Sequence, residues 1–279
     1  MNHGKLAHPS VKPVPVHWAN PIRQAKLDGI RTRVIAGEYP ILWTRTGNDI
    51  ADKLAGMQDP GWKLLAGSVF DCELIMADGS SPMAVISGKS IDQDVHLYVF
   101  DVLEARGHSI RIWPLCNRIA LLHAWNSESA LPAIMSPIPE VSSYEHAIGL
   151  GYEGIVTKDR YSAYGVKDSW RKQKQLLSHD ARIMNTKPGK GKYEGMIGSI
   201  LLQVIDAGKD TGIYAWSSGF SDADRLRLTH YFQGKTAEQI SAMGVQVEVQ
   251  AQSMSAHKRL RHPRVIRIRW DLTNSLGQA

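Results

Sequence analysis

The chain has 279 residues, of which 43% are hydrophobic and 22% charged, and a formal net charge of +6. This length suffices for one large domain or two smaller ones, and the composition is that of a globular protein. Its two cysteines, Cys72 and Cys116, are too few for a cysteine zinc cluster and favour a reducing compartment. Pro9, Pro13 and Pro15 interrupt an N-terminus that has no long apolar stretch. We therefore expect no signal peptide, no membrane-spanning segment and a cytoplasmic location.

The first part of the chain mixes predicted strands and helices. An extended, proline-rich lead-in covers residues 1–20. Short runs rich in β-branched and aromatic residues then predict strands at 33–36, 41–44, 69–76 and 96–102. The apolar spacing of residues 115–125 predicts a helix, and residues 142–150 predict a second one, capped by one of its first two serines. A buried strand is expected to begin at Gly154.

The pattern changes near residue 178, and a segment rich in glycine and lysine follows at 186–198. Strand-like runs occur at 199–205, 212–217, 245–249 and 266–270. The last run is expected to place Ile266 and Ile268 on one face and arginines on the other. Ser221 begins a capping-box pattern that opens one helix. About five short strands and one helix are compatible with a small Greek-key barrel of the oligonucleotide-binding (OB) kind.

The second part of the chain is the basic part. Residues 179–279 carry 14 Lys and Arg against 9 Asp and Glu, whereas residues 1–178 carry 19 against 18. Basic residues recur close to the C-terminus, at Lys258, Arg259, Arg261, Arg264, Arg267 and Arg269. Such an excess favours a polyanionic partner such as nucleic acid over solubility alone. We therefore expect an α+β protein of two domains, residues 1–178 and residues 179–279.

The hexapeptide Lys-Leu-Asp-Gly-Ile-Arg at 26–31 holds an amine, a carboxylate, a glycine and a guanidinium in one short turn. An amine acts as a nucleophile when it loses its proton, and a neighbouring cation favours that loss. Asp-Gly is also a common turn pair, so a surface turn is the alternative. The hexapeptide thus predicts either a nucleophilic Lys26 or an ordinary turn.

Five further motifs follow along the chain. They are Thr-Arg-Thr-Gly at 44–47, Phe-Asp-Cys-Glu at 70–73, Tyr-Val-Phe-Asp at 98–101, Glu-Gly-Ile-Val-Thr-Lys at 153–158 and Trp-Arg-Lys-Gln-Lys at 170–174. With the hexapeptide, in this order and spacing, they resemble the motifs of the small ATP-dependent DNA ligases of bacteriophages and bacteria, members of the covalent nucleotidyltransferase superfamily. The sequence departs from that pattern at Gln24, where many relatives have glutamate, and at Cys72, where glycine is usual. The resemblance implies a nucleotidyltransferase (adenylation) domain followed by an OB-fold domain.

The resemblance also implies a covalent nucleotide site. Lys26 would form a phosphoramidate with the AMP of ATP, and Glu73 would accept from the ribose hydroxyl. Phe100 would stack on the purine, although a phenylalanine inside a strand is more often plain core. The adenine pocket would be completed by Gln24, Ala25 and Val156.

Phosphate contacts are implied for five basic residues, namely Arg31, Arg45, Lys158, Lys172 and Lys174. A guanidinium suits this task because it donates two parallel hydrogen bonds. Lys172 and Lys174 alternate along one strand, so a solvated basic face is the alternative for them. Glu153, together with Glu73, is the implied ligand of Mg²⁺, for which Mn²⁺ can substitute.

The implied partner is nicked double-stranded DNA. The protein is expected to be a monomer and to bind no membrane. The expected DNA contacts are Arg31, Arg45, Lys187, Lys190, Lys192, Arg261, Arg264 and Arg267. Contacts of this kind hold backbone phosphates and read no sequence, so little sequence preference is expected. A linker at residues 177–181 is expected to act as the hinge between the domains.

Other functions stay open at this point. An RNA ligase or a GTP-using capping enzyme of the same superfamily is the nearest alternative, and a non-catalytic nucleic-acid-binding protein is an alternative of another class. The sequence has neither a phosphate-loop motif nor a dinucleotide-binding glycine fingerprint. ATP is therefore favoured over NAD as the nucleotide.

Overall fold

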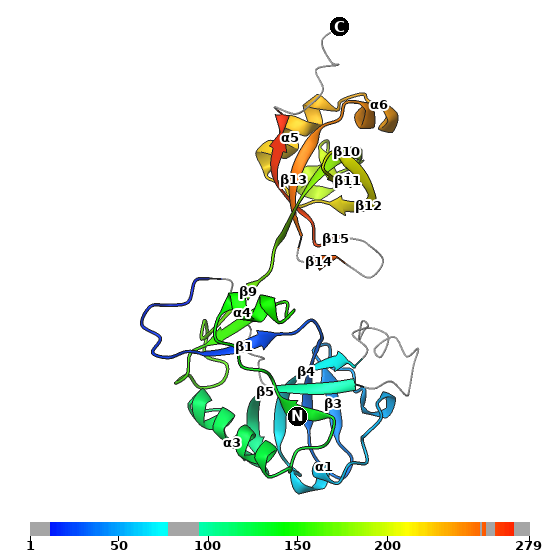
Figure 1. The fold of residues 1–279 in the computed structure, drawn as a ribbon. Helices are drawn as coiled ribbons and strands as arrows, with labels where there is room; N and C mark the ends of the chain where they lie inside the picture. Colours follow the sequence, from blue (N-terminus) through cyan, green and yellow to red (C-terminus); the bar gives the residue numbers. More distant parts are fainter. Residues whose placement is uncertain (1–11, 78–94, 252, 255–259, 271–279) are drawn as a thin grey trace. The chain divides into compact units, whose positions relative to one another are not determined.

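The computed structural model describes residues 12–77, 95–251, 253–254 and 260–270. The chain separates into two compact units, Met1–Lys174 and Gln175–Ala279 (Figure 1). We call them the N-terminal and the C-terminal unit. Among the described residues, no helix is long and apolar enough to cross a membrane.

The larger sheet of the N-terminal unit has six strands in the order β3-β2-β4-β5-β6, with β7 on β5. These strands are β2 (Ile30–Ile35), β3 (Ile41–Thr44), β4 (Val69–Met76), β5 (Val95–Ala105), β6 (His108–Ser109) and β7 (Met135–Pro137). All neighbours are antiparallel except β5 and β7, which are parallel. The strands expected at 41–44 and 69–76 are confirmed with the same bounds. The strand expected at 96–102 is longer, and the one expected at 33–36 begins three residues earlier and ends one residue earlier.

The smaller sheet of the N-terminal unit brings three of the motifs together. Its order is β1-β8-β9, with β1 at Ile22–Lys26, β8 at Gly154–Lys158 and β9 at Trp170–Lys174. Lys26 pairs with Gly154, which pairs in turn with Lys174. Gly154 has a φ of 154°, and a Cβ there would lie 2.0 Å from the carbonyl oxygen of Gln173. Only glycine therefore permits this close pairing beside Lys26.

Helices complete the core of the N-terminal unit. They are η1 (Ala51–Lys53), α1 (Gly61–Leu64), α3 (Leu115–Ser127) and α4 (Tyr144–Gly149). Figure 1 shows α3 beside β5, and the ring of Trp125 on α3 meets Phe70 edge to face at 5.9 Å. The hydroxyl of Ser143 accepts from the backbone N–H of His146 and thereby caps α4. Both helices expected here are confirmed, with Ser143 rather than Ser142 as the cap.

The C-terminal unit is a five-stranded antiparallel sheet in the order β12-β11-β10-β13-β16. Its elements are β10 (Leu177–Pro188), η2 (Gly191–Tyr193), β11 (Ile197–Asp206), β12 (Lys209–Ser217), α5 (Asp222–Tyr231), α6 (Ala237–Ala242), β13 (Gln246–Ala251), β14 (Ser253–Met254), β15 (Leu260–Arg261) and β16 (Arg264–Arg269). A parallel bridge joins Gly219, just after β12, to Arg264 of β16, and so brings the two outer strands together as in a closed barrel.

Two expectations for the C-terminal unit were wrong. The sequence predicted one helix, but α6 is a second one, begun by a complete capping box of Thr236 and Gln239. The alternation along β16 is also broken, because Ile266 is 44% exposed while Val265 is buried. The register with β13 shifts between Val265 and Arg267, so Ile266 is the extra residue of a bulge.

The expected hinge at residues 177–181 is also wrong, because these residues form the start of β10. They pair with β13 from Leu177, opposite Ala251, onward. Only Gln175 and Leu176 separate β9 from β10.

Candidate active site

A cavity of about 110 Å³ is lined by residues from both sheets of the N-terminal unit. Its lining residues are Gln24, Ala25, Lys26, Leu27, Arg31, Glu73, Phe100, Ile138, Val156, Lys158 and Trp170. A mainly apolar lining with a few polar groups is typical of small-molecule sites. Eight of the residues that the sequence analysis assigned to nucleotide binding or catalysis therefore face one cavity.

The amine of Lys26 lies at the end of β1, held by a carboxylate. Its Nζ donates to Glu153 Oε2 at 2.6 Å and to the carbonyl of Leu27 at 3.3 Å. The other oxygen of Glu153 is 2.5 Å from the ammonium of Lys174. Burial lowers the pKa of Lys172, and the charges of Lys174 and Lys26 lower it further. The lysines predicted on β9 are thus neighbours of Lys26 and Glu153.

Glu73 on β4 is a second carboxylate close to this amine. Its Oε1 accepts from the backbone N–H of Gly29 at 3.2 Å. Burial raises the pKa of Glu73 to about 7, although the charges of Lys26 and Arg31 act in the opposite direction. Glu73 therefore changes its charge close to neutral pH, where it can either accept or donate a hydrogen bond.

Two aromatic rings and a buried lysine form one wall of the cavity. Phe100 and Trp170 meet edge to face at 5.9 Å, and the Nζ of Lys158 lies 4.0 Å from the centre of the Trp170 ring. Lys158 also donates to the carbonyl of Phe100 at 2.9 Å. Burial lowers the pKa of Lys158 to about 7. The side chain of Phe100 is 8% exposed and therefore belongs to the core, and it also lines the cavity. Both interpretations from the sequence, a core residue and a contact for the purine, thus agree with its position.

Gln24 brings an unused hydrogen-bond acceptor to the same cavity. Its Nε2 faces the carbonyl of Phe100 at 3.5 Å, which orients the amide, and its buried Oε1 has no hydrogen-bond partner among the residues that the structure describes. A buried acceptor without a donor costs about 1–3 kcal/mol of folding free energy. A ligand that donates a hydrogen bond at this point would recover that free energy.

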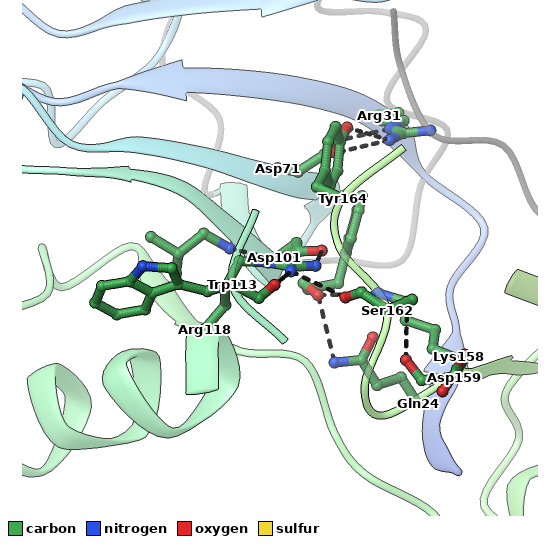
Figure 2. A network of polar contacts seen from close by, with 12 residues as sticks. Gln24, Arg31, Asp71, Asp101, Trp113, Arg118, Lys158, Asp159, Ser162 and Tyr164 are labelled. Carbon is green, nitrogen blue, oxygen red and sulfur yellow. Dashed lines mark hydrogen bonds and ion pairs between the residues drawn. The ribbon is translucent and has the colours of Figure 1, made fainter. Parts of the chain in front are cut away.

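Arg31 stands between this cavity and a second one. It donates to both oxygens of Asp71, at 2.8 Å and 2.5 Å, and the hydroxyl of Tyr164 completes the cluster at 2.5 Å from Asp71 Oδ2 (Figure 2). The bidentate pair fixes the guanidinium plane. The second cavity, of about 490 Å³, has polar and basic walls formed by Arg31, Arg33, Trp43, Thr44, Arg45, Thr46, Gly47 and Asp71. Its three guanidiniums suit a phosphate group.

A buried ion pair lies directly behind Phe100 and was missed in the sequence. Arg118 on α3 donates to both oxygens of Asp101, at 2.7 Å and 2.9 Å, and both side chains are fully buried (Figure 2). Arg118 also donates to the carbonyls of Trp113 and Ser162. The available signal was a charged residue inside each of two apolar runs, since a buried charge needs a partner.

The residues expected to hold DNA in the C-terminal unit differ in their contacts. Lys192 is 2.7 Å from Asp222, and Arg267 is 3.8 Å from Glu248. Lys187 places its ammonium 4.0 Å from the centre of the Trp216 ring. Lys190 and Arg264 are exposed. The side chain of Arg261, like Lys258 and Arg259, lies outside the described residues.

The acidic residues fit a metal ion that is shared with a ligand. Among the described residues, no group of three or more His, Cys, Asp or Glu could hold a metal ion by itself. Mg²⁺ is often bound by one or two carboxylates together with phosphate oxygens and water. Glu153 and Glu73, on either side of Lys26, offer that donor set.

Comparison with known proteins shows which proteins this chain is similar to. Residues 188–269 match the family model described as DNA ligase OB-like domain. The chain is 28% identical over 200 residues to a probable DNA ligase of Nocardia farcinica, covering 64% of this chain and 38% of that protein. It is 27% identical over 297 residues to a DNA ligase of Haloarcula marismortui, covering 92% of this chain and 52% of that protein.

The chain is therefore similar in sequence to part of proteins named DNA ligase. It spans about two fifths to one half of the length of these two relatives. A solved structure from a study of Lig E DNA ligases as a minimal scaffold has a TM-score of 0.63 and 19% identity, and covers 94% of this chain and 99% of that one. Mycobacterial DNA ligase D, solved with ATP and MES, has a TM-score of 0.52 and 19% identity, with 96% and 95% covered. The α+β fold with an OB domain is thereby confirmed.

Proposed function

We propose that the chain is an ATP-dependent DNA ligase that seals nicks in duplex DNA. The observation that carries the proposal is the amine of Lys26, 2.6 Å from Glu153 and at the wall of a cavity with an aromatic side and an unused amide acceptor. The N-terminal unit is the adenylation domain and the C-terminal unit an OB-fold DNA-binding domain. The two units divide between Lys174 and Gln175, four residues before the boundary expected from the sequence at residues 178 and 179. The relatives named DNA ligase support the choice of reaction.

In the first step, the neutral amine of Lys26 attacks the α-phosphorus of ATP. A nitrogen–phosphorus bond forms, the bond to pyrophosphate breaks, and the amine loses a proton, for which Glu153 is in hydrogen-bond contact. Lys172 and Lys174 on β9 stabilise the charge that gathers on the phosphate oxygens. Mg²⁺ held by Glu153 and Glu73 with the phosphates would supply further neutralisation of that charge.

In the second and third steps, AMP is transferred from Lys26 to the DNA and is then released. The 5′-phosphate of the nick attacks the adenylate on Lys26, so the nitrogen–phosphorus bond breaks and a pyrophosphate link forms. Arg31 and Arg45, both lining the second cavity, hold that 5′-phosphate. The neighbouring 3′-hydroxyl then attacks the 5′-phosphorus, and AMP leaves with the bond electrons. Nick sealing therefore uses both cavities, and Arg31 belongs to each of them.

The cavity favours adenine over guanine. Gln24 presents its unpartnered oxygen, which accepts from the 6-amino group of adenine but finds no donor in the 6-oxo group of guanine. Phe100 and Val156 offer apolar contact to the ring faces, and Glu73 accepts from the ribose when it is ionised. These preferences support ATP over GTP and so a ligase over a capping enzyme.

The test is covalent labelling followed by sealing. The protein is incubated with Mg²⁺ and either α-³²P-ATP or α-³²P-GTP, denatured and separated on a gel. We expect label from ATP in the parent and none in Lys26→Ala. Lys63→Ala removes an exposed lysine of α1 and is the matched control, which should be labelled like the parent.

A singly nicked duplex then tests the complete reaction. The parent and Lys63→Ala should convert the nicked strand to its full length, whereas Lys26→Ala should not. Label on Lys26→Ala would refute Lys26 as the nucleophile. Binding of nicked duplex without any uptake of AMP would instead make the chain a binding module, and labelling from GTP alone would favour a capping enzyme.

A further inference from the structure

Two aromatic side chains stand outward from β12 in the C-terminal unit. Tyr214 is 43% exposed and Trp216 is 38% exposed, whereas the alternate residues Ile213 and Ala215 are 9% exposed and belong to the core. Large aromatic side chains are usually buried, and two of them exposed on one strand face indicate a binding surface. We call this surface, formed by Tyr214 and Trp216, the β12 face.

Neighbouring strands hold the rings of the β12 face in place. Tyr214 lies opposite Gln203 of β11, and Trp216 lies opposite Leu201, which is half-buried. The Nε2 of Gln203 donates to the hydroxyl of Tyr214 at 2.7 Å. These contacts limit the motion of the rings, so little conformational entropy is lost when a ligand packs on them.

Positive charge lies directly beside these rings. The ammonium of Lys187 on β10 is 4.0 Å from the centre of the Trp216 ring. Lys190, in the segment that joins β10 to β11, is exposed. A cation on a flexible stem can leave a ring and contact a phosphate when another flat group stacks there. The β12 face thus combines flat apolar rings with cations, which suits a polyanion that also carries flat bases.

The position of the β12 face within the barrel agrees with this chemistry. OB folds bind oligonucleotides on the face of their second and third strands and with the loop between the first two. In the C-terminal unit these strands are β11 and β12 (Figure 1), and the loop between β10 and β11 contains Lys190. The family of the domain, by itself, says nothing about Tyr214 or Trp216.

We infer that the β12 face binds single-stranded DNA by stacking unpaired bases on Trp216 and Tyr214. In a duplex the flat faces of the bases are covered by their neighbours, so a stacking surface requires a strand whose bases are exposed. Side chains two residues apart on a strand are about 6.6 Å apart, which leaves room for each ring to meet a different base. Lys187 then contacts the adjacent phosphate. This binding requires neither a nick nor ATP, so it goes beyond the proposed sealing reaction.

The test measures fluorescence anisotropy of the complete chain with fluorescein-labelled oligo(dT) of about 16 nucleotides. A strand of the same length without bases keeps the phosphates and removes stacking. We expect the parent to bind oligo(dT) more tightly than the strand without bases. Trp216→Ala should weaken oligo(dT) binding roughly 5- to 150-fold and leave the other strand unaffected, because one stacked base is lost.

Matched variants separate stacking from other effects. Trp216→Phe keeps a flat ring and should retain most of the affinity, while Lys187→Met should lower the salt dependence by roughly 0.7 log units per log unit of salt. Trp113→Ala removes a tryptophan of the N-terminal unit that is 43% exposed, and should bind like the parent. Circular dichroism melting should show that each variant is folded.

Three outcomes would overturn the inference. The first is equal oligo(dT) affinity of the parent and Trp216→Ala. The second is an equal loss on the strand without bases, which would make Trp216 a phosphate contact. The third is an equal loss on a blunt duplex of the same length, which would make the β12 face a duplex contact. Labelling by ATP should be normal in Trp216→Ala, so a failure here leaves the proposed ligase activity untouched.

Discussion

Lys158→Met should stabilise the folded protein at neutral pH while it destroys the nucleotide site. Lys158 is 1% exposed, and burial lowers its pKa from 10.5 to about 7. Between these two values the unfolded chain binds a proton that the folded chain does not. The free energy of unfolding therefore rises with pH across this interval, and the full destabilisation by the buried amine is present at and below pH 7.

The expected magnitude follows from the width of that interval. The pKa of Lys158 is 10.5 in the unfolded chain and about 7 in the folded one. This difference, at about 1.36 kcal/mol for each pH unit, gives the folded state a penalty of about 5 kcal/mol below pH 7. Lys158→Met removes this penalty but also removes the donor at 2.9 Å from the carbonyl of Phe100, which keeps only the long contact from Gln24 at 3.5 Å; this loss costs about 1–3 kcal/mol. The variant should therefore gain about 2–4 kcal/mol at pH 7. The gain should shrink by about 1.4 kcal/mol for each pH unit above 7 and finally change sign.

The assay is urea unfolding of the parent and the variant at a series of pH values between about 6 and 9.5. Lys63→Met is the matched control, because the side chain of Lys63 is 64% exposed and its difference from the parent should not vary in this range. A variant that is less stable than the parent at pH 7, with a parallel pH dependence, would refute the reasoning and show that Lys158 stays charged when buried. Lys158→Met should also take up no AMP, a trade of activity for stability that is common at active sites.

Three further predictions concern residues around the same cavity. Arg118→Met leaves the fully buried Asp101 without its ion-pair partner and should lower the free energy of unfolding by about 3–5 kcal/mol in urea titrations. The double variant with Asp101→Leu should regain part of this loss. If the losses of the two single variants simply add, the two residues are not a coupled pair. Because burial raises the pKa of Glu73 to about 7, the rate of AMP uptake by the parent should fall as the pH drops below 7. Glu73→Gln should be slower than the parent at pH 8 and should not show this fall. If the fall is unchanged in Glu73→Gln, another group causes it. Gln24→Leu removes the unpartnered oxygen, so its urea midpoint should equal or exceed that of the parent while the apparent KM for ATP rises roughly 2- to 15-fold; an unchanged KM would exclude the contact with the base.

The sequence by itself was sufficient for several of the elements and for the chemistry of the motifs, although it did not predict β1, β10 or α6. The expected strands at 41–44 and 69–76 have the same bounds in the structure, because their runs of apolar and β-branched residues have no competing pattern. The motifs also indicated which side chains meet, since Lys26, Glu73 and Lys158 line one cavity and Glu153 bonds to Lys26. Local patterns of this kind are readable because each depends on residues that are close in the chain.

Only the tertiary structure determined the features that depend on residues far apart in the chain. The bulge at Ile266 arises from its register with β13, and the outward direction of Trp216 from its place in the barrel. Arg118 pairs with Asp101 because α3 packs on β5, which no local pattern specifies. Burial decides the rest, because the same lysine at position 158 would keep its ordinary pKa in water and has one near 7 inside the protein.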